Sequence, residues 1–137
     1  MGKKIDIPDD EHFTSKIGTI QFSTNLDKCD IEIDTSNSDI AHFHIRNKEK
    51  KIDISIQLYN NEYYGENTIY LNDIEKRELI GFLEREEELP FYNQTNYIHL
   101  QSTWESMNNE YSNYPEENED KYRQTIPNYN NMKESIH

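Results

Sequence analysis

Several residue types on which common enzyme sites depend are scarce or missing in this chain of 137 residues. It has four glycines, and the GxxxxGKS/T, GxGxxG and GxSxG patterns are absent, which excludes a motif-based phosphate cradle and a nucleophile elbow. Neither CxxC nor HExxH occurs, and the single cysteine, Cys29, cannot form an internal disulfide. A lone cysteine is typical of a reducing compartment, so the sequence predicts a cytoplasmic protein. We expect no cofactor.

Cations and apolar runs are also scarce. Lys and Arg number 14 against 27 Asp and Glu, a formal net charge of −13 at pH 7. Direct binding to nucleic acid or to an anionic membrane needs clustered cations, so the composition argues against both. Hydrophobic residues make up 33% of the chain, and no apolar run approaches the roughly 20 residues of a membrane-spanning helix. The sequence predicts one small domain with a small core.

Apolar residues alternate with polar ones along four consecutive segments between Ile17 and Tyr59. The apolar positions are Ile20 and Phe22; Cys29, Ile31 and Ile33; Ala41, Phe43 and Ile45; and Ile52, Ile54, Ile56 and Leu58. This period of two, with short polar stretches between the segments, indicates an antiparallel meander. One face of such a sheet is buried, and the other meets solvent or a partner.

The period changes after Tyr59, and two helices are predicted. Asn72 can cap the first helix, with Glu75 at the third helical position as in a capping box, and the helix continues to about Glu86, with Pro90 stopping it. The second helix runs from about residue 96 to 111. Its apolar stripe has spacings of three and four and consists of Tyr97, Leu100, Trp104, Met107 and Tyr111.

The predicted fold class is therefore α+β, a four-stranded antiparallel meander with two helices packed on one face. Composition divides the chain into a flexible N-terminal arm (1–16), a single α+β domain (17–111) and a flexible acidic tail rich in Asn, Glu and Tyr (112–137). The tail has too few aliphatic residues to build a core, so we expect it to be disordered or to lie over the domain. Its one apolar patch is Ile126–Tyr129.

The outward face of the predicted sheet carries the one group of residues suited to chemistry. His42 and His44 leave the same face of a strand, about 6.5–7 Å apart along it. Acids of the neighbouring strands share that face, namely Asp30, Glu32, Asp34 and Asp53. Two imidazoles beside carboxylates can hold a divalent metal or act as an acid–base pair. The alternative is ordinary cross-strand ion pairing with Arg46, which would neutralise the same carboxylates. Cys29 is expected on the inner face as an inert thiol.

Acidic runs form a second candidate surface. They comprise Glu86, Glu87 and Glu88, and then Glu116, Glu117, Glu119 and Asp120. Together with the acids of the sheet face, they can imitate the charge of a nucleic-acid backbone and occupy a basic groove of another protein. Ten tyrosines favour protein contact. The alternative is a solvated surface that keeps the chain soluble.

Short motifs between Ile40 and Met132 carry a resemblance. The segment Ala41-His42-Phe43-His44-Ile45 resembles the PHFHV strand of small uncharacterised proteins from phages and mobile elements of low-GC bacteria. Further similarity lies in a helix from Leu71-Asn72 to Phe82-Leu83, a helix from Thr95 to Trp104 and the segment Pro127–Tyr129. The resemblance implies a phage or mobile-element setting and brings no established activity.

These observations predict a non-enzymatic acidic inhibitor that binds and blocks a basic nucleic-acid-binding host protein, such as a CRISPR-type defence nuclease. One alternative is a metal-dependent or acid–base site around His42 and His44. Another is an antitoxin-like partner of a basic toxin. The exposed edge of a meander also offers a route to a homodimer.

Overall fold

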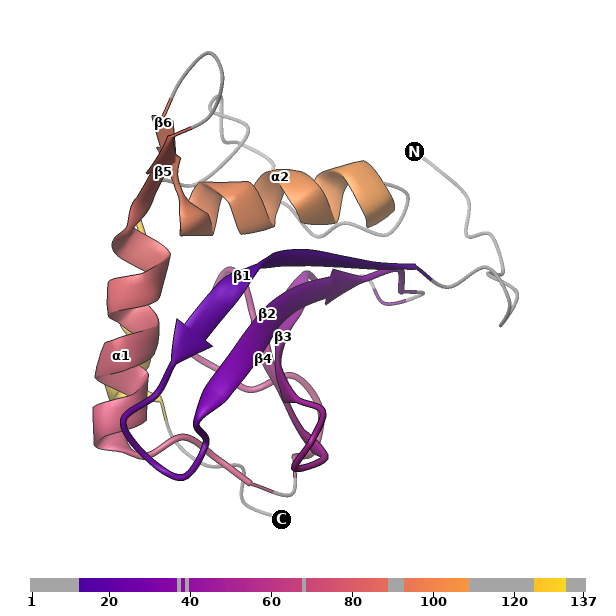
Figure 1. Cartoon of the computed structure of the whole chain (residues 1–137). Coiled ribbons are helices and arrows are strands. Elements are labelled where there is room, and N and C mark those ends of the chain that lie inside the picture. The colour runs from indigo at the N-terminus through magenta and orange to yellow at the C-terminus, as the bar shows by residue number, and fades with distance from the viewer. Residues whose placement is uncertain are drawn as a thin grey trace.

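Four antiparallel strands in sequential order form the main sheet (Figure 1). They are β1 (Thr14–Gln21), β2 (Lys28–Asp34), β3 (His42–Asn47) and β4 (Ile52–Gln57). The computed structural model describes residues 13–36, 38, 40–67, 69–88, 93–108 and 125–132. Helices α1 (Asp73–Glu84) and α2 (Asn96–Asn108) pack on the sheet. The predicted α+β fold, with its meander and two helices, is confirmed.

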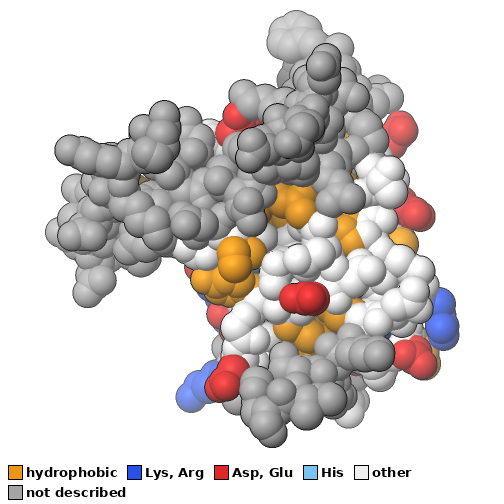
Figure 2. Space-filling model, turned by 180° about the vertical axis from the view of Figure 1, so that it is seen from behind, with side chains coloured by type: hydrophobic (Ala, Val, Ile, Leu, Met, Phe, Trp, Pro, Cys, Tyr) orange, Lys and Arg blue, Asp and Glu red, His pale blue; other side chains and the backbone are white. Residues whose placement is uncertain are grey.

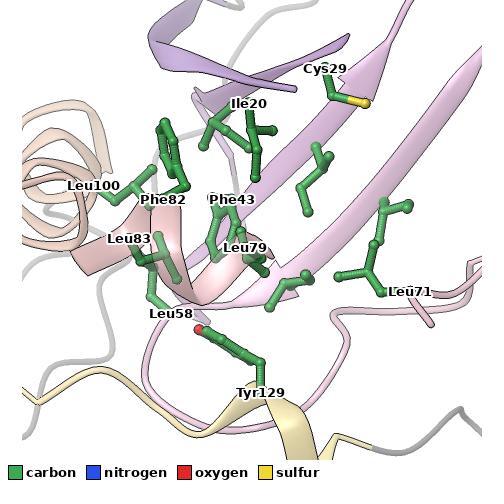
Figure 3. Packing of buried hydrophobic residues seen from close by; sticks show 14 of the residues in the cluster. Ile20, Cys29, Phe43, Leu58, Leu71, Leu79, Phe82, Leu83, Leu100 and Tyr129 are labelled. Carbon is green, nitrogen blue, oxygen red and sulfur yellow. The ribbon is translucent and has the colours of Figure 1, made fainter. Parts of the chain in front are cut away.

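A row of isoleucines crosses the inner face of the sheet. Ile45 of β3 lies opposite Ile31 of β2 and opposite Ile54 of β4, and all three side chains are fully buried. The helices cover this face, as Figure 3 shows for Leu79 and Leu83 of α1. The alternation in the sequence therefore sets the register, because a slip by one residue would expose every isoleucine.

Gly18 allows α1 to approach β1 closely. The register between β1 and β2 shifts between Lys16 and Gly18, which is a β-bulge. A Cβ atom on Gly18 would lie 3.1 Å from Cζ of Phe82. A larger residue at this position would push α1 away from the sheet.

The start of α1 is as predicted, but its end is not. Asn72 and Glu75 form the capping box, since each side chain accepts a hydrogen bond from the backbone N–H of the other residue. The helix ends at Glu84, two residues earlier than expected, and Arg85 is extended. A two-stranded ribbon follows, which the sequence analysis did not predict. Its strands are β5 (Glu86–Glu88) and β6 (Asn93–Thr95).

The edge of the sheet at β4 is covered by the segment that follows it. The backbone N–H of Gln57 donates to Glu62 O (3.0 Å), and that of Tyr64 donates to Ser55 O (2.9 Å). Tyr63 forms an isolated bridge with Ile56. Among the residues that the structure describes, β1 pairs only with β2, so β1 is the uncovered edge.

A segment from beyond residue 111, within the stretch assigned to the tail, completes the core. Tyr129 begins the short 3-10 helix η3 (Tyr129–Asn131), is fully buried, and donates its hydroxyl to Gln57 O (2.9 Å). Lys76 of α1 is buried and donates from Nζ to Met132 O (2.5 Å). The predicted flexible arm (1–16) is wrong for Thr14–Lys16, which belong to β1 and pair with β2. Residues 1–12 of that arm, Pro90 and Tyr111 lie outside the described residues. Within the described ranges, no helix has the length and apolar character needed to cross a membrane.

Candidate functional site

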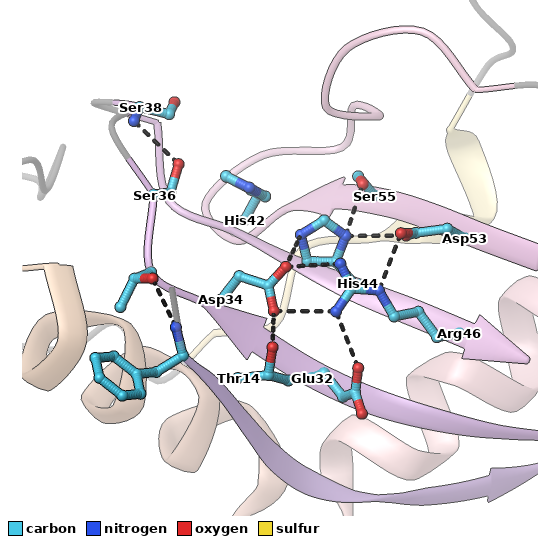
Figure 4. Close-up of polar contacts among 12 residues, drawn as sticks. Thr14, Glu32, Asp34, Ser36, Ser38, His42, His44, Arg46, Asp53 and Ser55 are labelled. Atoms are coloured by element: carbon cyan, nitrogen blue, oxygen red, sulfur yellow. Dashed lines mark hydrogen bonds and ion pairs between the residues drawn. The ribbon is translucent and has the colours of Figure 1, made fainter. Parts of the chain in front are cut away.

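Arg46 lies at the centre of the outward face of the sheet, surrounded by three carboxylates (Figure 4). It donates from Nε to Asp53 Oδ2 (2.9 Å) and from Nη1 to Glu32 Oε1 (2.9 Å). It also binds both oxygens of Asp34, at 3.0 Å from Nη1 and 2.6 Å from Nη2. The cross-strand ion pairing that the sequence suggested around Arg46 is confirmed, and one guanidinium joins three strands.

The other predicted acids of this face are also paired with cations. Glu32 is 3% exposed, and Lys48 Nζ donates to its Oε2 (3.0 Å). Lys16 Nζ lies 3.3 Å from Asp30 Oδ1. The four sheet-face acids therefore neutralise cations of the same sheet, and Glu32 has almost no surface for a partner to contact.

His44 takes part in this network without forming a catalytic triad. Its Nδ1 lies 2.9 Å from Asp53 Oδ1 and 3.0 Å from Ser55 Oγ, and its Nε2 lies 3.6 Å from Asp34 Oδ2. In a triad the hydroxyl and the carboxylate contact opposite nitrogens of the imidazole. Here Ser55 and Asp53 both contact Nδ1, and the 3.6 Å from Nε2 to Asp34 Oδ2 is too long for a hydrogen bond, so no carboxylate is hydrogen-bonded to the nitrogen opposite the hydroxyl.

The carboxylates of the network are held in their ionised form. Burial favours the neutral form of Asp34, but hydrogen bonds from Arg46 and Thr14 outweigh it and lower the pKa of Asp34 from 3.8 to about 2. The pKa of Asp53 is lowered as well, against burial, by hydrogen bonds from His44 and Arg46. Burial would lower the pKa of Arg46, yet hydrogen bonds to Asp34, Glu32 and Asp53 raise it. Neither aspartate is poised to exchange a proton near pH 7.

His42 shares the face of His44, but its ring is covered. Its side chain stacks on Tyr64, with ring centroids 3.7 Å apart, and its ring centroid lies 5.0 Å from that of Trp104. Its exposed fraction is only 4%, and Nδ1 lies 2.8 Å from Ile40 O. Burial lowers the pKa of His42 from 6.5 to about 4, so the imidazole is neutral at pH 7. The sequence pattern missed this cover, because Tyr64 comes from the segment that folds back along β4.

The geometry does not support a metal centre at the two histidines. Their ring centroids are 5.3 Å apart. The guanidinium of Arg46 takes the place that a cation would need among the carboxylates. In the part of the chain that the structure describes, no group of three or more His, Cys, Asp and Glu residues is arranged to hold a metal ion.

An open hollow of about 410 Å³ lies on the same face. Its lining comprises Thr14, Glu32, Arg46, Lys48, Lys51, Ile52 and Asp53. The two acids of this lining pair with Arg46 and Lys48, as described above. The hollow therefore has no unpaired carboxylate to attract a small cationic ligand.

Cys29 is inert, as the sequence suggested. Its side chain is fully buried on the inner face, and Sγ contacts Leu26 O at 3.4 Å. Burial, followed by the charge of Asp30, raises the pKa of the thiol to about 11. The reactive thiolate is therefore suppressed at neutral pH.

Of the predicted acidic runs, the structure describes the one at the end of α1. Figure 1 shows the ribbon β5–β6 beyond that end, and Glu84 and Glu86 are exposed. The backbone of Glu87 and Glu88 belongs to β5, while their side chains lie outside the described part. Glu116, Glu117, Glu119 and Asp120 also lie outside it.

Figure 2 shows one face of the molecule, on which apolar side chains lie among uncharged atoms, with several acidic side chains and fewer cations. Comparison of the chain with protein-family models, curated proteins and solved structures finds no match.

Proposed function

We propose that the protein acts without catalysis, by binding a basic surface of a nucleic-acid-binding protein and blocking it. The observation that carries this proposal is the acidic ribbon, which we define as Glu84 with strand β5, Glu86–Glu88. It lies at the end of α1, and Arg85, between Glu84 and Glu86, is the one cation of the segment 84–88.

The position of the acidic ribbon works against the stability of α1. The C-terminal end of a helix carries partial negative charge and is stabilised by cations, by about 0.3–1 kcal/mol each. The last turn of α1 contains Glu84 and no basic residue, and the nearest cation is Arg85 at the C-cap. Three consecutive glutamates then form β5, although glutamate is depleted in strands. Local sequence choices that oppose stability are expected where function requires them.

The contacts of the sheet face divide the predicted acids into two groups. Asp30, Glu32, Asp34 and Asp53 hold cations of the same face, so in this proposal their role is structural. The acids that contact the partner are Glu86, Glu87 and Glu88, with Glu116, Glu117, Glu119 and Asp120 as a second group.

A basic groove that binds nucleic acid is the complementary partner. The net charge of −13 attracts such a groove over a distance of about a Debye length, roughly 8–10 Å at physiological salt. In a phage or mobile-element setting, a cytoplasmic host nuclease of the CRISPR type has this chemistry. A basic toxin has it too, so an antitoxin-like role is the alternative that the identity of the partner decides.

The test is affinity capture from nuclease-treated host lysate on immobilised protein, with elution by a salt gradient and by a DNA or RNA oligonucleotide. Three variants are compared with the wild type. They are Glu86→Gln/Glu87→Gln/Glu88→Gln, Glu116→Gln/Glu117→Gln/Glu119→Gln and the control Glu49→Gln/Glu62→Gln/Glu66→Gln, which removes the same charge from exposed sites elsewhere.

We expect a basic nucleic-acid-binding protein that oligonucleotide and high salt both release. At least one of the first two variants should retain it tenfold less well, and the control should retain it normally. Equal losses of partner retention in all three variants would mean that binding depends on the net charge alone and not on the positions of these acids. A partner that oligonucleotide does not release would contradict the proposed mimicry.

A further inference from the structure

The buried face of α2 contains a glutamine whose amide makes no hydrogen bond to any residue that the structure describes. Gln101 is 0% exposed, and it lies four residues after Tyr97 and three before Trp104, which are both fully buried. Neither Nε2 nor Oε1 of Gln101 has a partner among the described residues. An unsatisfied buried polar group is costly, and most such groups in folded proteins bond to protein or to ordered water.

Two other polar side chains of this face bond to backbone carbonyl groups elsewhere in the fold. Tyr97 donates its hydroxyl to Leu58 O (2.5 Å), and Asn108 donates from Nδ2 to Asp34 O (3.0 Å). These contacts hold both ends of α2. Gln101 lies between them without a contact of this kind, so its amide requires a different partner.

Trp104 presents a second unsatisfied group on the same face of α2. Its indole Nε1–H is buried and has no acceptor in the part of the chain that the structure describes. Residues three apart on a helix are neighbours, with Cβ atoms about 5–6 Å apart. The amide of Gln101 and the indole N–H of Trp104 therefore belong to adjacent side chains, and together they offer both donors and an acceptor.

His42 of β3 adds an acceptor beside the indole. Its ring centroid lies 5.0 Å from that of Trp104, with 54° between the ring planes, so the rings meet at an angle and not face to face. Nδ1 of His42 lies 2.8 Å from Ile40 O. Because a carbonyl oxygen only accepts, Nδ1 carries the proton of the neutral ring. Nε2 is then an acceptor, to which no described residue donates.

We propose that α2 and β3 enclose a binding site for ordered water, bounded by Gln101, Trp104 and His42. Water fits this set of groups because it both donates and accepts hydrogen bonds, and because it is small enough for a site whose side chains are at most 4% exposed. None of the three groups is charged at pH 7, so the site favours a neutral ligand over an ion.

Bound water joins α2 to β3 through hydrogen bonds that these side chains do not make directly. It accepts from the indole N–H of Trp104 and from Nε2 of Gln101, and it donates to Oε1 of Gln101 and to Nε2 of His42. The site is independent of the acidic ribbon, and its test involves no partner protein.

The indole N–H of Trp104 reports on the site, because Trp104 is the only tryptophan of the chain and its signal is unique in an NMR spectrum. Nuclear Overhauser transfer from water is measured on the wild type, on Gln101→Leu and on the control Tyr97→Phe, which removes a hydroxyl bonded directly to the backbone. We expect a cross-peak with the sign of long-lived bound water in the wild type and the control, and its loss in Gln101→Leu.

Absence of this cross-peak from the wild type overturns the proposal, and that measurement decides even if Gln101→Leu does not fold. A cross-peak of wild-type strength in Gln101→Leu excludes the amide from the site and overturns the proposal as well.

Thermal unfolding of the same three proteins is the second readout. Leucine is close to glutamine in volume and has no polar side-chain atom. If water satisfies the amide, Gln101→Leu breaks the hydrogen bonds of the site, and Tm falls as it does in Tyr97→Phe. In a dry site, the substitution removes two unsatisfied polar atoms, and Tm does not fall. A Tm that rises or stays the same in Gln101→Leu therefore overturns the proposal.

Discussion

Asp34 and Arg46 form a two-point ion pair across the sheet, with Nη1 to Oδ1 at 3.0 Å and Nη2 to Oδ2 at 2.6 Å. The same guanidinium also binds Glu32 and Asp53. One side chain of β3 therefore neutralises carboxylates of both neighbouring strands. The sequence indicated this face of the sheet as a candidate active site. It is better explained as an ion-pair network that links the strands of the meander.

Replacing Arg46 with Met should destabilise the fold by about 3–5 kcal/mol, because it leaves partly buried carboxylates without their cation. Urea unfolding at pH 7 measures the loss. Lys16→Met is the control, since Lys16 is more than half exposed and its pair with Asp30 contributes about 0–1 kcal/mol. A loss below 1 kcal/mol for Arg46→Met would mean that the network is not structural.

The stability of the wild-type protein should fall between pH 7 and pH 5 because of His42. The pKa of this imidazole is about 4 in the folded state and 6.5 as the reference value, so the unfolded chain binds more protons in this range. The free energy of unfolding should decrease by about 2 kcal/mol from this group alone.

The variant His42→Phe keeps a ring to stack on Tyr64 and cannot be protonated. Its stability should change less than that of the wild type over the same pH range, as followed by urea unfolding at pH 7, 6 and 5. Parallel pH profiles for the two proteins would show that the imidazole is not responsible.

Gly81→Ala should raise the free energy of unfolding by about 0.5–1 kcal/mol, since the added methyl group meets nothing and the helix gains a better helix former. Gly65→Ala is the matched comparison. Gly65 has φ +70°, a backbone conformation that a side chain disfavours, so this variant should lose stability by about 1 kcal/mol. Thermal unfolding of the wild type and the two variants measures these changes. A change of the same sign in both variants would contradict the prediction.

A chain ending at residue 124 should lose several kcal/mol of stability, because it removes Tyr129 and Met132 from the core. It also leaves Lys76 buried without its acceptor, Met132 O. The control ends at Met132 and keeps each of these contacts. Chemical unfolding should give a large loss for the first chain and little for the second, and similar stabilities would show that the segment does not support the fold.

Features encoded by neighbouring residues could be predicted from the sequence. The capping box depends only on the spacing of Asn72 and Glu75, and the faces of the strands depend only on alternation. The sequence predicts the end of α1 at about Glu86, two residues beyond the observed end at Glu84. Glutamate is a good helix former, so local preference favours a longer helix. The strand that forms there instead depends on pairing with β6, which is not visible in the local sequence.

Contacts between distant segments could not be predicted in this way. The cover on His42 requires Tyr64, which reaches it only when the chain folds back along β4. The place of Tyr129 depends on the carbonyl of Gln57, 72 residues earlier. Alternation likewise placed Glu32 on an outward face, and only the side chains of Arg46 and Lys48 explain why it is buried there.

The covered edge of β4 also limits how copies of this protein can assemble. Continuous growth of a sheet from chain to chain requires two free edges on every molecule, one to extend and one to be extended. Among the described residues, the main sheet has one uncovered edge, at β1, because Glu62 and Tyr64 bond to the outer side of β4. Addition of strands to the main sheet from copy to copy through these residues therefore ends with a pair.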